Sequence, residues 1–289
     1  MPTFLAALLI GAWTSSAIGQ KPEEETHCLY SGRLLKDCKV RFQNLDLPKG
    51  FRLVLNGYDL KVKIEGDLTI GDDATIMSFD PRPSLPPAAL RTAAKRGANG
   101  RNAGRVSFEV EGAARGTLRI INRGEDGQNG QNGAKGDDGR PGSPGIDSES
   151  SVLFCRKGGF PGGRGGDGGN GGAGGSGGNA GLPGMLSVEI EGDRKGFQLL
   201  YDLRAGIPGL GGQGGMGGAG GAAGTGGRDS LFCAAAEPGA VGRAGQNGRP
   251  GKKGLGFPWL ELEPILNPWD IKAVDLEKVN PDDKNGSKK

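Results

Sequence analysis

The stretch GGRGGDGGNGGAGGSGG, residues 162–178, decides how this chain folds. Two of every three residues in it are glycine, and this enrichment is local. The chain has 59 glycines among 289 residues, and 51 of them lie within residues 97–256. Because a glycine inside a helix or strand costs about 0.5–1 kcal/mol, such a segment excludes a conventional α-helical or α/β enzyme domain.

Outward from this stretch, glycine recurs at every third residue in four runs. They are run 1, residues 124–145; run 2, residues 163–184; run 3, residues 206–227; and run 4, residues 239–254. Runs 2 and 3 largely double the glycine, as X-Gly-Gly, whereas runs 1 and 4 have it once per triplet. A short stub with Gly97 and Gly100 precedes them.

A period of three is that of the extended polyproline II helix, which rises about 3.1 Å per residue and has no internal hydrogen bonds. A glycine edge lets a neighbouring backbone approach and pair with the free N–H and C=O groups. A helix inside a bundle touches several neighbours and needs more than one such edge. We therefore expect a polyglycine II bundle formed within one chain, with runs 2 and 3 inside and runs 1 and 4 outside.

Two alternatives to this bundle remain. A trimeric collagen-like stalk also uses glycine at every third residue, but proline is rare within 97–256. Collagen-like chains usually carry at least about 15–20% proline or hydroxyproline. A flexible glycine-rich linker is the second alternative, and the strict register of the runs argues against it.

Alternating apolar and charged residues lie between the glycine runs and predict half-buried strands. Four stretches share this pattern: residues 62–66, 108–112, 188–192 and 260–264. The two middle copies are each followed by a further apolar stretch, so we expect two β-hairpins in a small sheet. Residues i and i+2 of a strand share one face. We therefore interpret the paired glutamates as solvent-facing rather than catalytic: Glu109 and Glu111, Glu189 and Glu191, Glu261 and Glu263.

A Leu-Phe-Cys motif also occurs twice, at 153–155 between runs 1 and 2 and at 231–233 between runs 3 and 4. Because the strand copies begin at 108 and 188, a repeating unit of about 80 residues is present twice. If each pair of runs extends outward and returns, both motifs lie at the same far end. We expect Phe154 and Phe232 to form a small apolar cap there.

Four cysteines are present, Cys28, Cys38, Cys155 and Cys233, and an even number in a secreted chain indicates disulfides. Four cysteines allow three pairings. The shared far end of the runs predicts the pair Cys155–Cys233. The remaining pair, Cys28–Cys38, would close a short N-terminal hairpin.

Composition divides the chain into five regions. These are a signal peptide at 1–19, an N-terminal β-rich region at 20–96, the glycine-rich repeats at 97–256, a closing strand and short helix at 257–279, and a disordered polar tail at 280–289. The first region is uncharged and mostly apolar and ends in small residues, as in a secretory signal peptide. We expect a secreted or cell-surface protein, with the periplasm as an alternative.

The sequence offers little material for chemistry. His27 is the single histidine, and the cysteines are not spaced as a zinc site requires. The net charge of +3 comes without a basic stripe, so no nucleic-acid partner is expected. No second long apolar run follows the leader, so no membrane-spanning segment is expected. We predict no catalytic, cofactor or metal site, and no enzyme.

The X-Gly-Gly runs with two disulfides resemble the snow-flea antifreeze protein, and they resemble the glycine-rich domains of phage tail-fibre adhesins. The Gly-Arg-Pro-Gly and Gly-Leu-Pro-Gly tetrads look like those of secreted bacterial collagen-like proteins. The resemblance covers residues 97–256 and implies a disulfide-stabilised bundle of polyproline II helices, here combined with short β-strands or hairpins in a mostly irregular and β fold.

These observations predict a structural or adhesive protein, such as a surface-fibre, matrix or adhesin component. Its expected partners are cell-surface or matrix components, together with further copies of itself. An ice-binding protein is the alternative function. Charged residues at X positions, such as Arg164 and Asp167, argue against it because ice-binding faces are flat arrays of small uncharged side chains.

Overall fold

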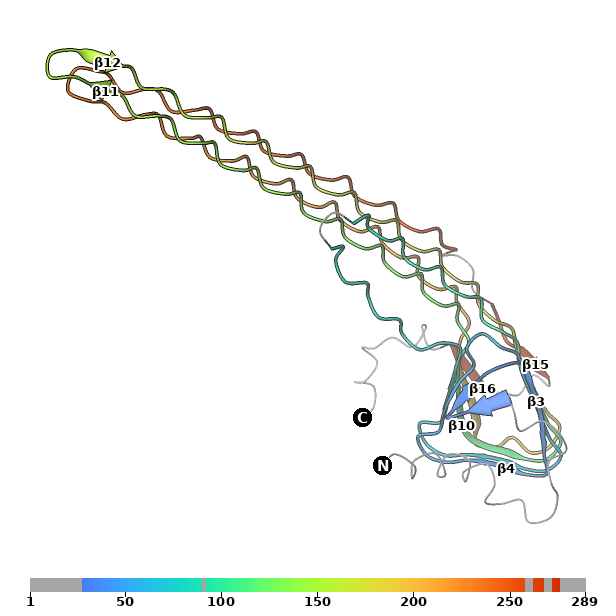
Figure 1. Ribbon diagram of the computed structural model, residues 1–289. Coiled ribbons are helices and arrows are strands. Elements are labelled where there is room, and N and C mark those ends of the chain that lie inside the picture. The colour runs from blue at the N-terminus through green and yellow to red at the C-terminus, as the bar shows by residue number, and fades with distance from the viewer. Residues whose placement is uncertain (1–27, 90–91, 258–261, 268–271, 276–289) are drawn as a thin grey trace, which may run out of the picture.

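The computed structural model describes residues 28–89, 92–257, 262–267 and 272–275 (Figure 1). Within these residues the chain forms short strands and extended segments and no helix. Most strands gather at one end of the molecule, and the glycine runs extend from them as a long rod that ends in a two-stranded hairpin, β11 (Glu149–Ser150) and β12 (Cys155–Lys157). The mostly β and irregular fold expected from the sequence is confirmed.

A five-stranded parallel sheet forms one side of the strand-rich end. Its order is β15 (Ile265–Asn267), β13 (Leu186–Ile190), β9 (Val106–Val110), β6 (Leu60–Ile64) and β3 (Cys38–Phe42). Equivalent positions stack in register, so that Phe108 pairs with Val62 on one side and Val188 on the other. The side chains at these three positions are buried, and the alternation of each strand brings them to the same inner face.

A nine-stranded sheet forms the other sides. Its parallel strands are β5 (Arg52–Val54), β8 (Thr75–Met77), β10 (Ala114–Ile121), β14 (Phe197–Asp202) and β16 (Lys272–Asp275). Strands β4 (Leu45–Leu47) and β7 (Leu68–Ile70) pair with each other, and β7 pairs with the start of β10. A hairpin of β1 (Leu29–Tyr30) and β2 (Arg33–Leu34) lies at the edge. Successive turns of the chain therefore stack as a parallel β-solenoid around one apolar core.

The expected β-hairpins are wrong. Strand β9 pairs with β6 and β13, and β10 pairs with β7, β8 and β14, so the two strands of each predicted hairpin do not pair with each other. The alternation identified the buried face correctly, but it carries no information about which strand is the neighbour. In a solenoid the neighbour is the equivalent strand of the next turn, as Val62 and Val188 are for Phe108.

Both long excursions into the rod occur between turns of the solenoid. Residues 122–185 connect β10 to β13, and the segment after β14 returns to the solenoid at β15. The regions 20–96 and 97–256 therefore share both sheets. Each excursion extends to the far end and returns, which places the two turns of the chain side by side there (Figure 1).

Backbone hydrogen bonds join the runs at every third residue. Run 1 donates to run 3 at every third residue, from Gly127 N to Ile207 O at 2.8 Å out to Gly145 N to Thr225 O at 2.7 Å. Run 2 donates to both run 1 and run 4, and it accepts from run 3. Runs 2 and 3, the doubled runs, also pair with each other and are flanked by runs 1 and 4. These contacts place the two doubled runs between the two single ones.

The glycines are required because backbones cross at very short range. A Cβ atom on Gly168 would lie 2.2 Å from the carbonyl oxygen of Gly218, and one on Gly218 would lie 1.9 Å from that of Asp137. Both separations are far below any real contact of a Cβ atom. A methyl group at either position could be accommodated only by moving a backbone.

Asparagine and aspartate side chains form a second ladder along the rod. Their Oδ1 atoms accept hydrogen bonds from backbone N–H groups of the neighbouring run, at 2.7–3.0 Å. The residues are Asn99, Asn102, Asp126, Asn129, Asn132, Asp138, Asp147, Asp167, Asn170, Asn179 and Asn247. The charged and amide residues at X positions thus have a structural use that the sequence reasoning missed.

The C-terminal region differs in part from the prediction. Of the closing strand expected at 260–264, residues 262–264 are described and form no strand: Leu262 N donates to Leu203 O, and strand β15 begins at Ile265. Residues 260 and 261 lie outside the described residues. The short helix expected at 271–279 is wrong over Lys272–Asp275, which forms strand β16 on the edge of β14. So short a segment is marginal as an isolated helix, and the edge strand offers backbone partners instead. The signal peptide at 1–19 and the tail at 280–289 lie outside the described residues.

Candidate functional site at the tip of the rod

Two turns of the chain form the far end of the rod, which we call the tip. The first connects β11 (Glu149–Ser150) to β12 (Cys155–Lys157), which pair antiparallel. Ser151 organises it: its N–H donates to Phe154 O at 2.9 Å, and its hydroxyl accepts from Phe154 N at 3.2 Å. The intervening side chains therefore point away from a fixed backbone.

The second turn is closed by reciprocal backbone hydrogen bonds between Ser230 and Cys233, at 3.0 and 3.1 Å. Ser148 connects the two turns through its hydroxyl, which reaches Arg228 O and Ser230 Oγ, both at 3.0 Å. A disulfide then joins Cys155 to Cys233 across them. The predicted pairing is confirmed here and at the other end of the molecule, where Cys28 is bonded to Cys38 beside the short N-terminal hairpin.

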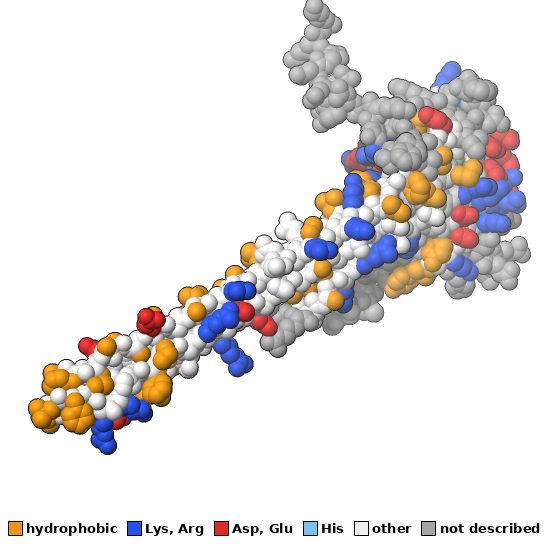
Figure 2. All heavy atoms as spheres, turned by 90° about the horizontal axis from the view of Figure 1, so that it is seen from above, with side chains coloured by type: hydrophobic (Ala, Val, Ile, Leu, Met, Phe, Trp, Pro, Cys, Tyr) orange, Lys and Arg blue, Asp and Glu red, His pale blue; other side chains and the backbone are white. Residues whose placement is uncertain are grey.

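The tip exposes large apolar side chains, as Figure 2 shows at the end of the rod. Val152 is 85% exposed, Leu153 81% and Leu231 80%. Phe154 and Phe232, the residues of the expected apolar cap, lie at this end and are exposed as well. Contiguous exposed apolar surface on a soluble protein is typical of a site that contacts a partner.

Charged residues surround this apolar surface. Arg156 and Lys157 follow directly in β12 and are exposed, and the Lys157 ammonium lies over the Phe160 ring at 5.5 Å from its centre. Glu149 opposes Lys157 in the register of the hairpin and is exposed too. The end of the tip is therefore apolar, and both positively and negatively charged side chains lie beside it.

The buried carboxylate of Glu125 pairs with two arginines at the other end of the rod, where the rod leaves the solenoid. Glu125 is only 4% exposed and accepts from Arg82 at 2.5 Å and from Arg101 Nε at 2.9 Å. Burial alone would raise the pKa of Glu125, but the hydrogen bonds and charges of the two arginines outweigh it and lower the pKa. Sequence reasoning missed this cluster because nothing in the sequence relates residues 43 positions apart.

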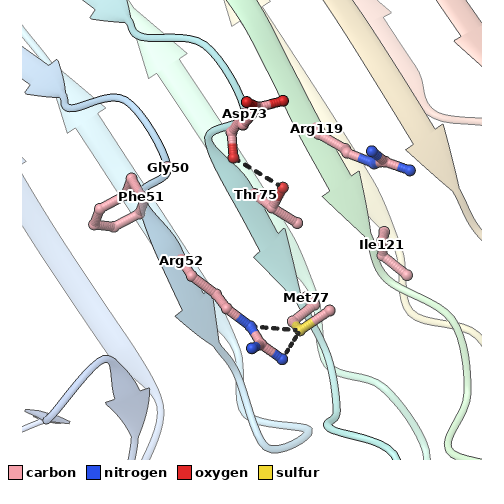
Figure 3. Close-up of a pocket in the computed structure, with 8 residues that line it drawn as sticks. All are labelled: Gly50, Phe51, Arg52, Asp73, Thr75, Met77, Arg119 and Ile121. Atoms are coloured by element: carbon pink, nitrogen blue, oxygen red, sulfur yellow. Dashed lines mark hydrogen bonds between the residues drawn. The ribbon is translucent and has the colours of Figure 1, made fainter.

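A shallow depression of about 290 Å³ lies on the outer face of the nine-stranded sheet (Figure 3). Arg52, one of its charged residues, contacts Met77 Sδ at 3.2 Å and pairs with Asp80 at 2.6 Å. The Thr75 hydroxyl donates to the backbone carbonyl of Asp73 rather than to a base. Apolar residues, Phe51, Met77 and Ile121, line the depression together with these polar ones.

Glu109 and Glu111 point outward, as expected, and contact lysines of the preceding turn. Glu189, Glu191 and Glu263 are exposed too, and Glu261 lies outside the described residues. Lys61 lies 2.5 Å from Glu109, and Lys63 lies 2.8 Å from Glu111. Among the described residues, no group of three or more histidine, cysteine, aspartate or glutamate side chains could hold a metal ion. The same part of the chain contains no helix long and apolar enough to cross a membrane.

Comparison of the chain with protein-family models, with curated proteins and with solved structures found no match in any of the three. The geometry of the tip is therefore the main support for a function.

Proposed function

We propose that the chain is a secreted, non-enzymatic structural or adhesive protein that binds through the tip, with cell-surface or matrix components as its partners. The observation that carries the proposal is the exposure of Val152, Leu153 and Leu231 at the far end of the rod. Apolar side chains so exposed are unfavourable in water by about 25 cal/mol per Å². A partner that covers them would regain that free energy.

We further propose that the four runs form a polyglycine II bundle, which holds the tip away from the solenoid. The hydrogen bonds at every third residue and the backbone contacts at glycine support this interpretation. The runs pair with one another in this way without a second chain, as a bundle requires and a trimeric collagen-like stalk does not. Light scattering tests this point: a mass of three chains that melts cooperatively to one would contradict the bundle.

Secretion is supported by the two disulfides, because disulfides persist mainly in oxidising compartments. The alternative function, ice binding, would require thermal hysteresis from the purified protein. We expect none, because Asp138, Arg140, Arg164 and Asp167 place exposed charged side chains along the rod.

Adsorption to an alkyl-coated sensor surface tests the adhesive role of the tip. The tip variant replaces all five apolar side chains with serine: V152S, L153S, F154S, L231S and F232S. The matched control replaces three exposed apolar residues on the side of the rod: I207S, L210S and M216S. We expect adsorption to fall at least tenfold in the tip variant and to stay within twofold of wild type in the control. Equal adsorption of both variants would contradict the proposal.

A further inference from the structure

An extended backbone can bind along the rod between runs 1 and 2, where it pairs with both of them. We call this position the lane. In the inner half of the rod, residues 95–103 of the chain occupy it (Figure 1). The N–H groups of Gln131, Gln128 and Glu125 donate to the carbonyls of Lys95, Ala98 and Arg101, at 2.9–3.0 Å. On the other side, Gly97, Gly100 and Ala103 donate to the carbonyls of Ser176, Asn179 and Leu182, at 2.7–3.0 Å.

The same two rows of backbone groups continue into the outer half of the rod. Three-residue steps from Gln131 lead along run 1 to Arg140 and Ser143, and steps from Ser176 lead along run 2 to Asn170 and Asp167. In the described part of the chain, the N–H groups of Arg140 and Ser143 and the carbonyls of Asn170 and Asp167 make no hydrogen bond. The outer half of the lane thus repeats the donors and acceptors of the inner half without the segment that pairs with them.

Glycine continues along this outer half although the contacts within the chain require it less there. Under residues 95–103, a Cβ atom on Gly178 would lie 1.9 Å from Ala98 O. On Gly166 or Gly169, a Cβ atom would meet nothing closer than 3.1 Å, and a shift of a few tenths of an ångström would relieve that contact. Gly178 is buried, whereas Gly166 is exposed. The bare outer lane therefore has the shape to admit one more backbone.

We propose that the outer half of the lane binds an extended segment of a different chain that has glycine at every third residue. Its carbonyls accept from Arg140 and Ser143, and its N–H groups donate to Asn170 and Asp167. Glycine is required on its inner edge because a Cβ atom on Gly97 or Gly100 of the resident segment would lie 1.8–1.9 Å from a carbonyl oxygen of run 1.

The resident segment also indicates the preferred side chain at one X position. Asn99 Oδ1 accepts from Asn179 N at 3.0 Å, and Asn102 Oδ1 accepts from Leu182 N at 2.9 Å. The N–H groups of Asn170 and Asp167 occupy the equivalent positions further out. A Gly-x-Asn repeat therefore matches the lane in its backbone and in its side chains. This site is separate from the tip and goes beyond the adhesive role proposed above.

The test uses a fluorescent peptide, (Gly-Ala-Asn)4, which repeats residues 97–99, and the full chain. We expect saturable binding by fluorescence anisotropy. The variant G166A/G169A should bind at least tenfold more weakly, because its methyl groups lie where the peptide carbonyls must pass. The control G158A, whose Cβ atom would meet nothing within 4 Å, should bind as wild type. The peptide (Ala-Ala-Asn)4 should not bind to any form, which tests the glycine requirement without altering the protein.

Absence of peptide binding to wild type, or equal binding by G166A/G169A with an unchanged melting temperature, would overturn the proposal. A wild-type dimer by light scattering that G166A/G169A abolishes would also overturn it, since a second copy would then fill the lane. The serine variant of the tip should bind the peptide as wild type does. Failure of the adhesive function and failure of the lane are therefore distinguishable.

Discussion

Asn99 and Asn179 are 80 residues apart and lie side by side, with Asn99 Oδ1 accepting a hydrogen bond from Asn179 N at 3.0 Å. Asn179 in turn accepts at its own Oδ1 from Leu255 N, a further 76 residues along the chain, also at 3.0 Å. Asn179 therefore links three passes of the chain, through its backbone N–H and its side-chain oxygen. Polyproline II segments have no hydrogen bonds of their own, so such links determine how firmly the passes hold together.

The variant N179A tests this ladder. It removes the acceptor of Leu255 N and leaves the backbone unchanged, so we expect a loss of about 1 kcal/mol in the free energy of unfolding. The variant N179D should restore most of it, because aspartate is the acceptor at equivalent positions such as Asp167. Urea denaturation followed by circular dichroism gives the comparison. A loss in N179D as large as that in N179A would show that the amide nitrogen matters more than the acceptor.

Glycine could be needed in the rod because a neighbouring backbone passes close by, or because the chain must be flexible. Alanine substitutions at the adjacent residues Gly168 and Gly169 distinguish these two reasons. A Cβ atom on Gly168 would meet Gly218 O at 2.2 Å, whereas one on Gly169 would meet Asp137 N at 3.1 Å. We expect G168A to destabilise the rod by about 3 kcal/mol, as overpacking does. We expect G169A to stay within about 1 kcal/mol of wild type, since alanine also reduces the entropy of the unfolded chain. Thermal melting measures both. Equal melting temperatures would contradict the proposed role of backbone contact.

The cysteine pairing at the tip could be predicted from the glycine period. The number of glycines in a run sets the length of that run, and their spacing sets which residues contact the neighbouring run. Runs 1 and 3 each hold eight glycines at three-residue spacing, so the two Leu-Phe-Cys turns extend equally far from the solenoid. The doubled glycines likewise identified the inner runs. The length of the runs and the placement of the doubled runs both follow from the spacing of glycine, which can be read directly from the sequence.

The solenoid could not be predicted in the same way. Alternation along 106–110 shows that Phe108 faces the core, but its neighbours Val62 and Val188 belong to other turns, far away along the chain. The tip was predicted as a small apolar cap of Phe154 and Phe232, but how far these side chains are exposed depends on contacts that the sequence does not show. The Glu125 cluster depends on Arg82 and Arg101 lying beside run 1, which no local pattern encodes.

Glu125 makes the stability of the rod dependent on pH. Its pKa in the folded protein is lowered, so its stabilising effect is complete above the ordinary glutamate pKa of about 4.3 and is lost as the pH falls through the lower, folded value. We expect E125Q to be destabilised by about 2 kcal/mol at pH 7, because it loses charged hydrogen bonds to Arg82 and Arg101. The difference between E125Q and wild type should shrink towards pH 3. An unchanged difference at pH 3 in urea denaturation would show that charge is not its source.

The disulfide Cys155–Cys233 should act mainly on the outer end of the rod. It closes a loop whose ends are 78 residues apart, which in the chain-entropy model is worth about 4–5 kcal/mol. In C155S/C233S we therefore expect faster amide hydrogen exchange at Gly142 and Gly145, whose N–H groups bond to run 3 near the tip. Exchange at Leu118 and Leu199, in the buried strands of the solenoid, should change little.

The matched control is C28S/C38S, which removes the other disulfide at the opposite end of the molecule. It should accelerate exchange around β1 and β2 and leave Gly142 and Gly145 as in wild type. The runs are joined at every third residue along their length, so the opening should begin at the tip and fade towards the solenoid. A uniform acceleration from the tip to the solenoid in C155S/C233S would mean that the rod opens as one cooperative unit, and that the tip disulfide stabilises all of it.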